Sequence, residues 1–323
     1  MSNLLSGLLG VVLATNQPAA LSNLVVKTTG VSVVLPNPSD PIEQEYQKLL
    51  AMDDDARAEI DRWITAEQEF KARGAEAPSG TLSLRVRQRL EKVKKAYEDF
   101  IFKNPKHSKA LIAFGSFLME SQDEEGAELQ WNKALKLDPT NPAVWNNLAN
   151  HYGHRSPVTK AFEYYAKAIE LDPKEPVYYQ NFATTVYLFR KDAMEHFQFN
   201  ETQVFDKALD LYRQAIKLAP DDFILASDYA QCFYGTKPPR WEDGLKAWDT
   251  ALTIARDQIE KDGVYIHMAR INLNLGRLNE AREKLNIVTN EMYLSLKATL
   301  SKKLANLESN GANRSSPDSL QQK

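Results

Sequence analysis

The sequence predicts an all-α protein built from repeated pairs of antiparallel helices, and three observations support this. Apolar residues recur at helical spacing, for example at Trp145, Leu148, Ala149 and Tyr152. The same pattern of small and aromatic residues is found again 34 residues away along the chain. Short stretches that carry Gly, Ser or Pro lie between the helical segments, and such stretches break helices.

The clearest repeat lies between Pro142 and Pro173. Its second helix carries small and aromatic residues on one face, namely Ala161, Tyr165 and Ala168. A residue of the same kind stands 34 positions before each of these residues and before the closing proline. These equivalents are Ala127, Trp131, Ala134 and Pro139. Four matched offsets indicate a true internal repeat, in which small residues let the paired helices approach closely.

The spacing W-x2-L-A-x2-Y…A-x3-Y…P, from Trp145 to Pro173, resembles the tetratricopeptide (TPR) signature W-x2-L-G-x2-Y…A-x3-F…P. Ala149 stands in place of Gly, and Tyr165 in place of Phe. The resemblance implies a right-handed TPR superhelix, an α-solenoid of antiparallel helix pairs, here with extra N- and C-terminal helices. It also implies that the first helix of each pair lines a concave groove that meets the ligand.

The chain divides into five segments by composition and periodicity. Residues 1–40 form an apolar segment and a Pro-rich linker, and residues 41–103 form N-terminal helices that include a half repeat. Residues 104–289 form the TPR array of four to five repeats. Residues 290–307 are expected to form a capping helix, because the last apolar face of such an array needs a cover. Residues 308–323 are rich in Ser, Asn and Gln and are expected to be disordered.

Within the N-terminal helices, Asp40 is placed to cap the first helix, with Pro41 at the first helical position. Three consecutive acidic residues, Asp53 to Asp55, suggest a break between two helices. Residues 74–80 carry two Gly and one Pro and are read as a linker.

The first residues allow two interpretations. Residues 4–13 are apolar, and Val12-Leu13-Ala14 presents small residues where a signal peptidase reads them. No Lys or Arg precedes this stretch, and Gly7 and Gly10 interrupt it. We expect a cleaved signal peptide, which would make the protein exported or periplasmic. The alternative is a disordered apolar tail or a mis-set start codon on a cytoplasmic protein.

Composition excludes several classes of function. The net charge of −3 gives no global basic field that would favour nucleic acid. The sequence contains no run of about 18 apolar residues, so it predicts no membrane-spanning helix. The single cysteine, Cys232, excludes an internal disulfide and a thiolate metal site, and its apolar neighbours predict a buried thiol.

No catalytic motif is present, so we predict neither an enzyme nor a cofactor. Two of the five histidines, His151 and His154, are three residues apart, and two metal ligands could share a helix face at that spacing. Glu163 lies across the following turn, but nothing in the sequence fixes its direction. We therefore favour polar turn residues over a metal site.

The non-core face of three first helices is polar in successive repeats. These residues are Asn146, Asn147 and Asn150, then Gln180, Asn181 and Thr184, then Ser227, Asp228 and Gln231. A carboxamide both donates and accepts hydrogen bonds, so a column of them can hold the backbone of an extended peptide. The pattern resembles the asparagine ladder of some TPR arrays. The alternative is a solvated polar face. The Lys and Arg pattern of the chaperone-binding TPR clamp is absent from the first helices of the first three repeats, where Ile112, Ser116, Asn146, Asn150, Val177 and Asn181 stand.

Two further segments each have two interpretations. An insertion of 13 residues within 189–202 carries Phe189, Phe197 and Phe199, which could form a flap or extend the core of their own hairpin. We favour the core extension. The basic cluster in residues 84–95 could attract phosphate, but interleaved leucines and a valine favour a solvated helix face over an RNA site.

We therefore predict a non-catalytic TPR scaffold that binds a protein or peptide segment in its groove. The alternative is an assembly or self-association module that acts through its outer or end surfaces. The sequence identifies neither the partner nor the oligomeric state.

Overall fold

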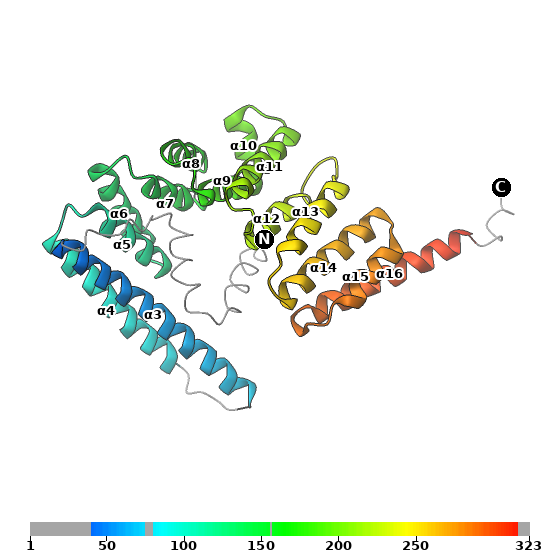
Figure 1. The fold of residues 1–323 in the computed structure, drawn as a ribbon, viewed down its shortest axis with the longest axis horizontal. Coiled ribbons are helices and arrows are strands. Elements are labelled where there is room, and N and C mark those ends of the chain that lie inside the picture. The colour runs from blue at the N-terminus through cyan, green and yellow to red at the C-terminus, as the bar shows by residue number, and fades with distance from the viewer. Residues whose placement is uncertain (1–39, 75–79, 156, 316–323) are drawn as a thin grey trace. The chain divides into compact units, whose positions relative to one another are not determined.

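The computed structural model describes residues 40–74, 80–155 and 157–315. These residues form fourteen α-helices and one short 3₁₀ helix, and this part of the chain contains no strand (Figure 1). The helices are α3 (Pro41–Ala72), α4 (Thr81–Lys103), α5 (Ser108–Glu120), α6 (Glu124–Leu137), α7 (Pro142–Gly153), α8 (Thr159–Leu171), α9 (Pro176–Leu188), α10 (Arg190–Phe197), α11 (Glu201–Leu218), α12 (Phe223–Cys232), α13 (Trp241–Ile254), α14 (Gln258–Leu275), α15 (Leu278–Ile287), η1 (Glu291–Tyr293) and α16 (Leu294–Ser315). The proposed signal peptide, most of both linkers and the last residues of the tail lie outside the described residues.

The helices form two compact units, residues 1–173 and residues 174–323. In the first unit α3 packs on α4, α5 on α6 and α7 on α8, and neighbouring pairs meet through α4 with α5 and through α6 with α7. In the second unit the pairs are α9 with α11, α12 with α13, and α14 with α15, and α16 covers α15 and α14. The predicted fold class is confirmed: all-α, in antiparallel pairs, with extra helices at both ends.

Helix starts follow the capping chemistry expected from the sequence. The side chain of Asp40 accepts a hydrogen bond from the Ile42 amide at 2.9 Å, with Pro41 at the first helical position. The same device begins α7, where Asn141 accepts from the Ala143 amide at 3.0 Å. These local signals set where the helices begin, because they satisfy amides that have no partner within the helix.

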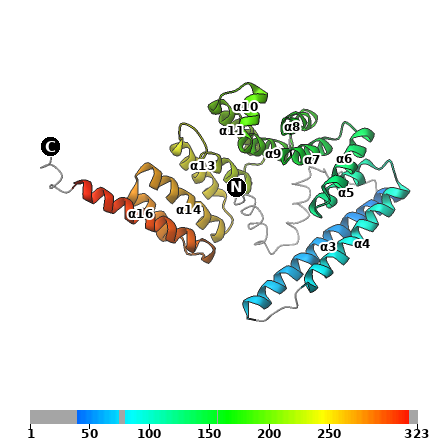
Figure 2. The ribbon, with the colours of Figure 1, turned by 180° about the vertical axis from the view of Figure 1, so that it is seen from behind.

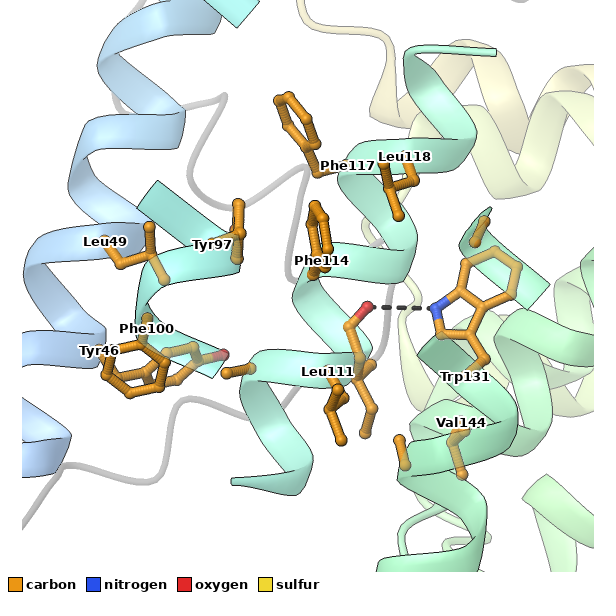
Figure 3. Packing of buried hydrophobic residues seen from close by; sticks show 14 of the residues in the cluster. Tyr46, Leu49, Tyr97, Phe100, Leu111, Phe114, Phe117, Leu118, Trp131 and Val144 are labelled. Atoms are coloured by element: carbon orange, nitrogen blue, oxygen red, sulfur yellow. Dashed lines mark hydrogen bonds between the residues drawn. The ribbon is translucent and has the colours of Figure 1, made fainter. Parts of the chain in front are cut away.

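Aromatic and small residues form the core of the first unit (Figure 3). Tyr97 of α4 stacks on Phe114 of α5 with ring centroids 5.2 Å apart. The Trp131 indole of α6 donates to the Ile112 carbonyl of α5 at 3.1 Å, the dashed line in Figure 3. This contact brings the indole so close to α5 that only glycine fits at position 115. A Cβ there would lie 2.4 Å from Trp131 Nε1.

The predicted break at Asp53 to Asp55 is wrong, because α3 is continuous from Pro41 to Ala72. Asp53 faces the core and is buried. Its carboxylate accepts from the Tyr97 hydroxyl at 2.8 Å and from Arg57 at 3.0 Å. These two donors balance the buried charge, so the acidic run is accommodated within the helix rather than ending it.

The last helix continues past Leu307, where the sequence predicted its end, to Ser315. Leu300, Leu304 and Leu307 pack against the core that α14 and α15 form, as a capping helix requires. The next residue, Glu308, pairs with Arg282 of α15. Composition alone predicted disorder because a contact of this kind cannot be read from a polar stretch.

The insertion between the helices of the third pair forms a separate short helix, α10. The ring of Phe197 lies 6.4 Å from that of Phe182 of α9, and 5.6 Å from that of Phe199. Lys207 of α11 lies over both Phe182 and Phe197. These contacts support the interpretation that the insertion extends the core of its own hairpin.

The glycine at position 115 gives a direct test of the helix contact. We expect Gly115→Ala to lower the free energy of unfolding by about 1–3 kcal/mol, because the added methyl overlaps the Trp131 indole. In a Trp131→Leu background the same substitution should become neutral or stabilising, since alanine is favoured over glycine in a helix by about 1 kcal/mol. Urea unfolding followed by circular dichroism measures both values. Equal losses in the two backgrounds would contradict the packing described here.

Candidate functional site

His151 of α7 and His154, the residue that follows this helix, have different environments. His151 is buried and its Nε2 lies 3.3 Å from Glu128 of α6, whereas His154 is exposed. The Tyr152 hydroxyl also donates to Glu128, at 2.7 Å, and this hydrogen bond is the main cause of a lowered pKa of the Glu128 carboxyl. Glu163 is exposed. The described residues contain no group of three or more His, Cys, Asp or Glu placed to hold a metal ion.

The lone thiol is inside the second unit, as predicted. Cys232 is buried at the end of α12, and burial raises the pKa of its thiol. A neutral buried thiol is a poor nucleophile, because the thiolate is the reactive form. None of the helices in the described residues is long and apolar enough to cross a membrane.

The polar residues predicted on α7 take part in helix packing. Asn146 and Asn147 are 0% and 3% exposed, so they do not lie on an open face as expected. The Asn147 amide donates to the Ser116 hydroxyl of α5 at 3.3 Å, and Asn150 accepts from the Tyr165 hydroxyl of α8 at 2.6 Å. Within the first unit these carboxamides therefore join α7 to its two neighbours.

The equivalent residues of the second unit are more accessible. Six side chains on α9 and α12 are all half-buried, and we call this set the α9–α12 polar face: Gln180, Asn181, Thr184, Ser227, Asp228 and Gln231. The Gln180 amide donates to Asp228 at 2.9 Å and joins the two helices. The Thr184 hydroxyl lies 2.7 Å from the Tyr212 hydroxyl of α11. The helix pairs thus bring two predicted site segments, 48 residues apart in sequence, into direct contact.

Asp228 is the electrostatic centre of this face. Burial raises the pKa of its carboxyl to about 6, the Gln180 hydrogen bond opposes this shift, and the nearby carboxylate of Asp222 adds to it. Near neutral pH the group is ionised and accepts hydrogen bonds, whereas below about pH 6 it carries a proton. With the carboxamides beside it, the face can both donate to and accept from a peptide backbone.

A cavity lies in the first unit, and sequence reasoning missed it. A cavity of about 510 Å³ is bordered by α3, α4 and the end of α5. Its apolar lining includes Ile64, Leu82, Val86, Leu90, Phe117 and Leu118. The apolar stripe of α4 could have revealed this cavity. The stripe continues from Leu90 to Val86 and Leu82, where the shorter helix α5 no longer packs against it.

The raised pKa makes the second unit pH-sensitive. The folded state binds a proton at Asp228 more tightly than the unfolded state, so its contribution to stability is fully present below pH 4 and is lost as pH rises through about 6. We therefore expect Asp228→Asn to be nearly neutral at pH 4 and stabilising by up to about 3 kcal/mol at pH 8. Urea unfolding of the full chain across this pH range measures the difference. Asp249→Asn, an exposed carboxylate on α13, is the control. A pH-independent effect of Asp228→Asn would contradict this assignment.

Comparison with known proteins agrees with the fold. The family model described as tetratricopeptide repeat matches residues 114–176. No curated protein matches the chain. Among solved structures, PilF of Pseudomonas aeruginosa is 14% identical, with 79% of this chain and 99% of that chain covered and a TM-score of 0.51. PilW, a type IV pilus biogenesis factor, is 14% identical, with 62% of this chain and 84% of that chain covered and a TM-score of 0.50.

At these identities the two structures show similarity of fold alone. The family match covers most of the two helix pairs in which the 34-residue repeat was recognised, and the chain on either side also forms paired helices. Together the repeat spacing, the family match and the paired helices show tetratricopeptide repeats in residues 114–176, within a chain of paired helices.

Proposed function

We propose that this chain is a non-catalytic scaffold that holds an extended segment of a partner protein against the α9–α12 polar face. The tetratricopeptide-repeat match over residues 114–176 supports the general role of a protein-interaction scaffold. The observation that carries the specific site is the contrast between the two units. The carboxamides Asn146 and Asn147 of α7 are buried, whereas Gln180, Asn181 and Gln231 are half-buried.

The chemistry of this face suits a peptide backbone better than a particular side chain. Gln180 and Gln231 each carry both donors and an acceptor, and Asp228 adds a carboxylate acceptor. A partner that brings its own amides would exchange hydrogen bonds with water for hydrogen bonds with these groups. Each such exchange contributes about 0.5–1.5 kcal/mol, so several are needed for useful affinity. Apolar side chains of the partner would supply the remainder of the binding energy.

The test uses a peptide selected on the full chain from a random-sequence phage library. We expect Asn181→Ala combined with Gln231→Ala to weaken binding of the fluorescein-labelled peptide about ten-fold, which corresponds to about 1.4 kcal/mol. Fluorescence anisotropy gives the affinity, and a thermal melt checks that the double variant and the control variant remain folded. Gln214→Ala, an exposed amide on the second helix α11, is the matched control. Unchanged affinity in the double variant, or an equal loss in the control, would remove the α9–α12 polar face from the proposal.

Self-association is the second candidate function, and exposed apolar side chains favour it. Four large apolar residues within 287–296 are exposed at the C-terminal end of the second unit: Ile287, Met292, Leu294 and Leu296. Exposed apolar groups that gather in one region commonly mark interaction surfaces. A second copy of the chain could cover them without involving the α9–α12 polar face.

If these residues form an interface between copies, the molar mass from light scattering should rise with protein concentration. Met292→Asp combined with Leu296→Asp should then keep the mass at that of one chain, because each buried carboxylate would destabilise the interface by several kcal/mol. Leu137→Asp, at an exposed leucine of α6 in the first unit, serves as the control. A monomer at all concentrations would count against self-association.

A further inference from the structure

The hairpin of α3 and α4 extends beyond the helix that packs on it. α4 has 23 residues and is about 35 Å long, whereas α5 has 13 residues and is about 20 Å long. The buried residues of α3 lie no further along than Ala56, and those of α4 no earlier than Val93. Figures 1 and 2 both show the far ends of the two helices extending past α5 and α6. This far half of the hairpin therefore has no third helix on it among the described residues.

The apolar seam between the two helices continues into this uncovered half. Ile60 and Ile64 of α3 and Leu82 and Val86 of α4 are each half-buried rather than buried. Two helices alone leave such a seam partly open to water, and a third helix is what normally buries it. The cavity of about 510 Å³ begins where α5 ends, with Phe117 and Leu118 forming one wall. A helix placed here would continue the line of α5 along the hairpin.

The α4 edge of the seam has a strongly biased charge. Between Thr81 and Lys95, α4 carries six basic residues and one acidic residue, Glu91. Some of this charge is already balanced, since Arg89 lies 2.9 Å from Glu59 and Lys94 lies 3.7 Å from Asp123. Arg87 is exposed at the cavity itself. Arg85 lies over the ring of Trp63 at 4.2 Å, and this cation–π contact does not neutralise the positive charge of its guanidinium.

We propose that the far half of the α3–α4 hairpin is a docking site for an amphipathic helix of a partner protein, with leucine-like residues on the seam and acidic residues along α4. Apolar burial would supply the affinity, and the basic edge would set the orientation and favour acidic partners. This site lies in the first unit and is independent of the α9–α12 polar face in the second.

Charge argues against two occupants from this chain itself. The only charged residue in residues 1–39 is Lys27, so that segment lacks the acidic complement of α4. In α16, which a second copy could offer, Lys297, Lys302 and Lys303 precede the first acidic residue, Glu308. A basic helix would be repelled by the edge of the seam. The acidic helix of a different protein is therefore the occupant that the surface fits.

The test titrates the full chain into three fluorescein-labelled 20-residue peptides and follows fluorescence anisotropy. The first peptide has leucines at i, i+3, i+4 and i+7 spacing flanked by glutamates, the second has lysines in place of the glutamates, and the third scrambles the first. We expect the glutamate peptide to bind at least about ten-fold more tightly than either of the others. Val86→Asp should weaken the affinity for the glutamate peptide by about ten-fold or more. Leu84→Asp, at an exposed leucine of the same helix, should leave this affinity unchanged.

A charge exchange keeps the test decisive if Val86→Asp perturbs folding. Arg87→Glu changes an exposed residue. We expect it to lower the affinity for the glutamate peptide and to raise the affinity for the lysine peptide, by about three-fold each. Lys92→Glu, exposed on another face of α4, is its control. Equal binding of the glutamate and lysine peptides, or no response to Arg87→Glu, would overturn the proposal. So would a photocrosslinker placed at Ser83 that reacts with residues 1–39 or with a second copy of the chain.

Discussion

The close approach of paired helices through alanine is the constraint on which the other features of this structure depend. Alanines on the second helices of successive pairs are completely buried in both units. They are Ala127, Ala134, Ala161 and Ala168 in the first unit, and Ala208, Ala215, Ala251 and Ala281 in the second. Protein interiors are close-packed, so a larger side chain at these positions would push the helices of a pair apart. The same closeness forces glycine at position 115, against the Trp131 indole.

This constraint decides which polar side chains are buried between helices. In the first unit α7 lies close enough to α5 that the amide of Asn147 reaches Ser116 and is buried there. In the second unit the amide of Gln180 bridges to Asp228 between α9 and α12, and both side chains stay half-buried. Equivalent positions in successive repeats therefore differ in burial and in hydrogen-bond partners. Among the carboxamides of the predicted face, Asn146 and Asn147 of the first unit are buried, whereas Gln180, Asn181 and Gln231 of the second unit are half-buried.

The sequence predicted the fold well because the fold rests on local, periodic signals. Capping residues such as Asp40 and the spacing of small residues locate the helices and their pairs without knowledge of distant contacts. The errors arise where a distant contact overrides composition. Asp53 is held inside a continuous helix by Tyr97, 44 residues away, and Glu308 pairs with Arg282 at a place where composition predicted disorder. The burial of Asn146 could not be predicted for the same reason, since helical spacing marks a polar face but not what covers it.

The most direct measurement of the central claim is a saturation scan of residues 108–173 in the full chain, with resistance to proteolysis as the readout. The account predicts that leucine is tolerated poorly at Ala127, Ala134, Ala161 and Ala168, and well at exposed helix positions such as Lys136. The least tolerant positions should therefore recur at 34-residue spacing. Resistance that is unchanged by leucine at all four alanines would contradict the claim that close approach through alanine holds the helix pairs together.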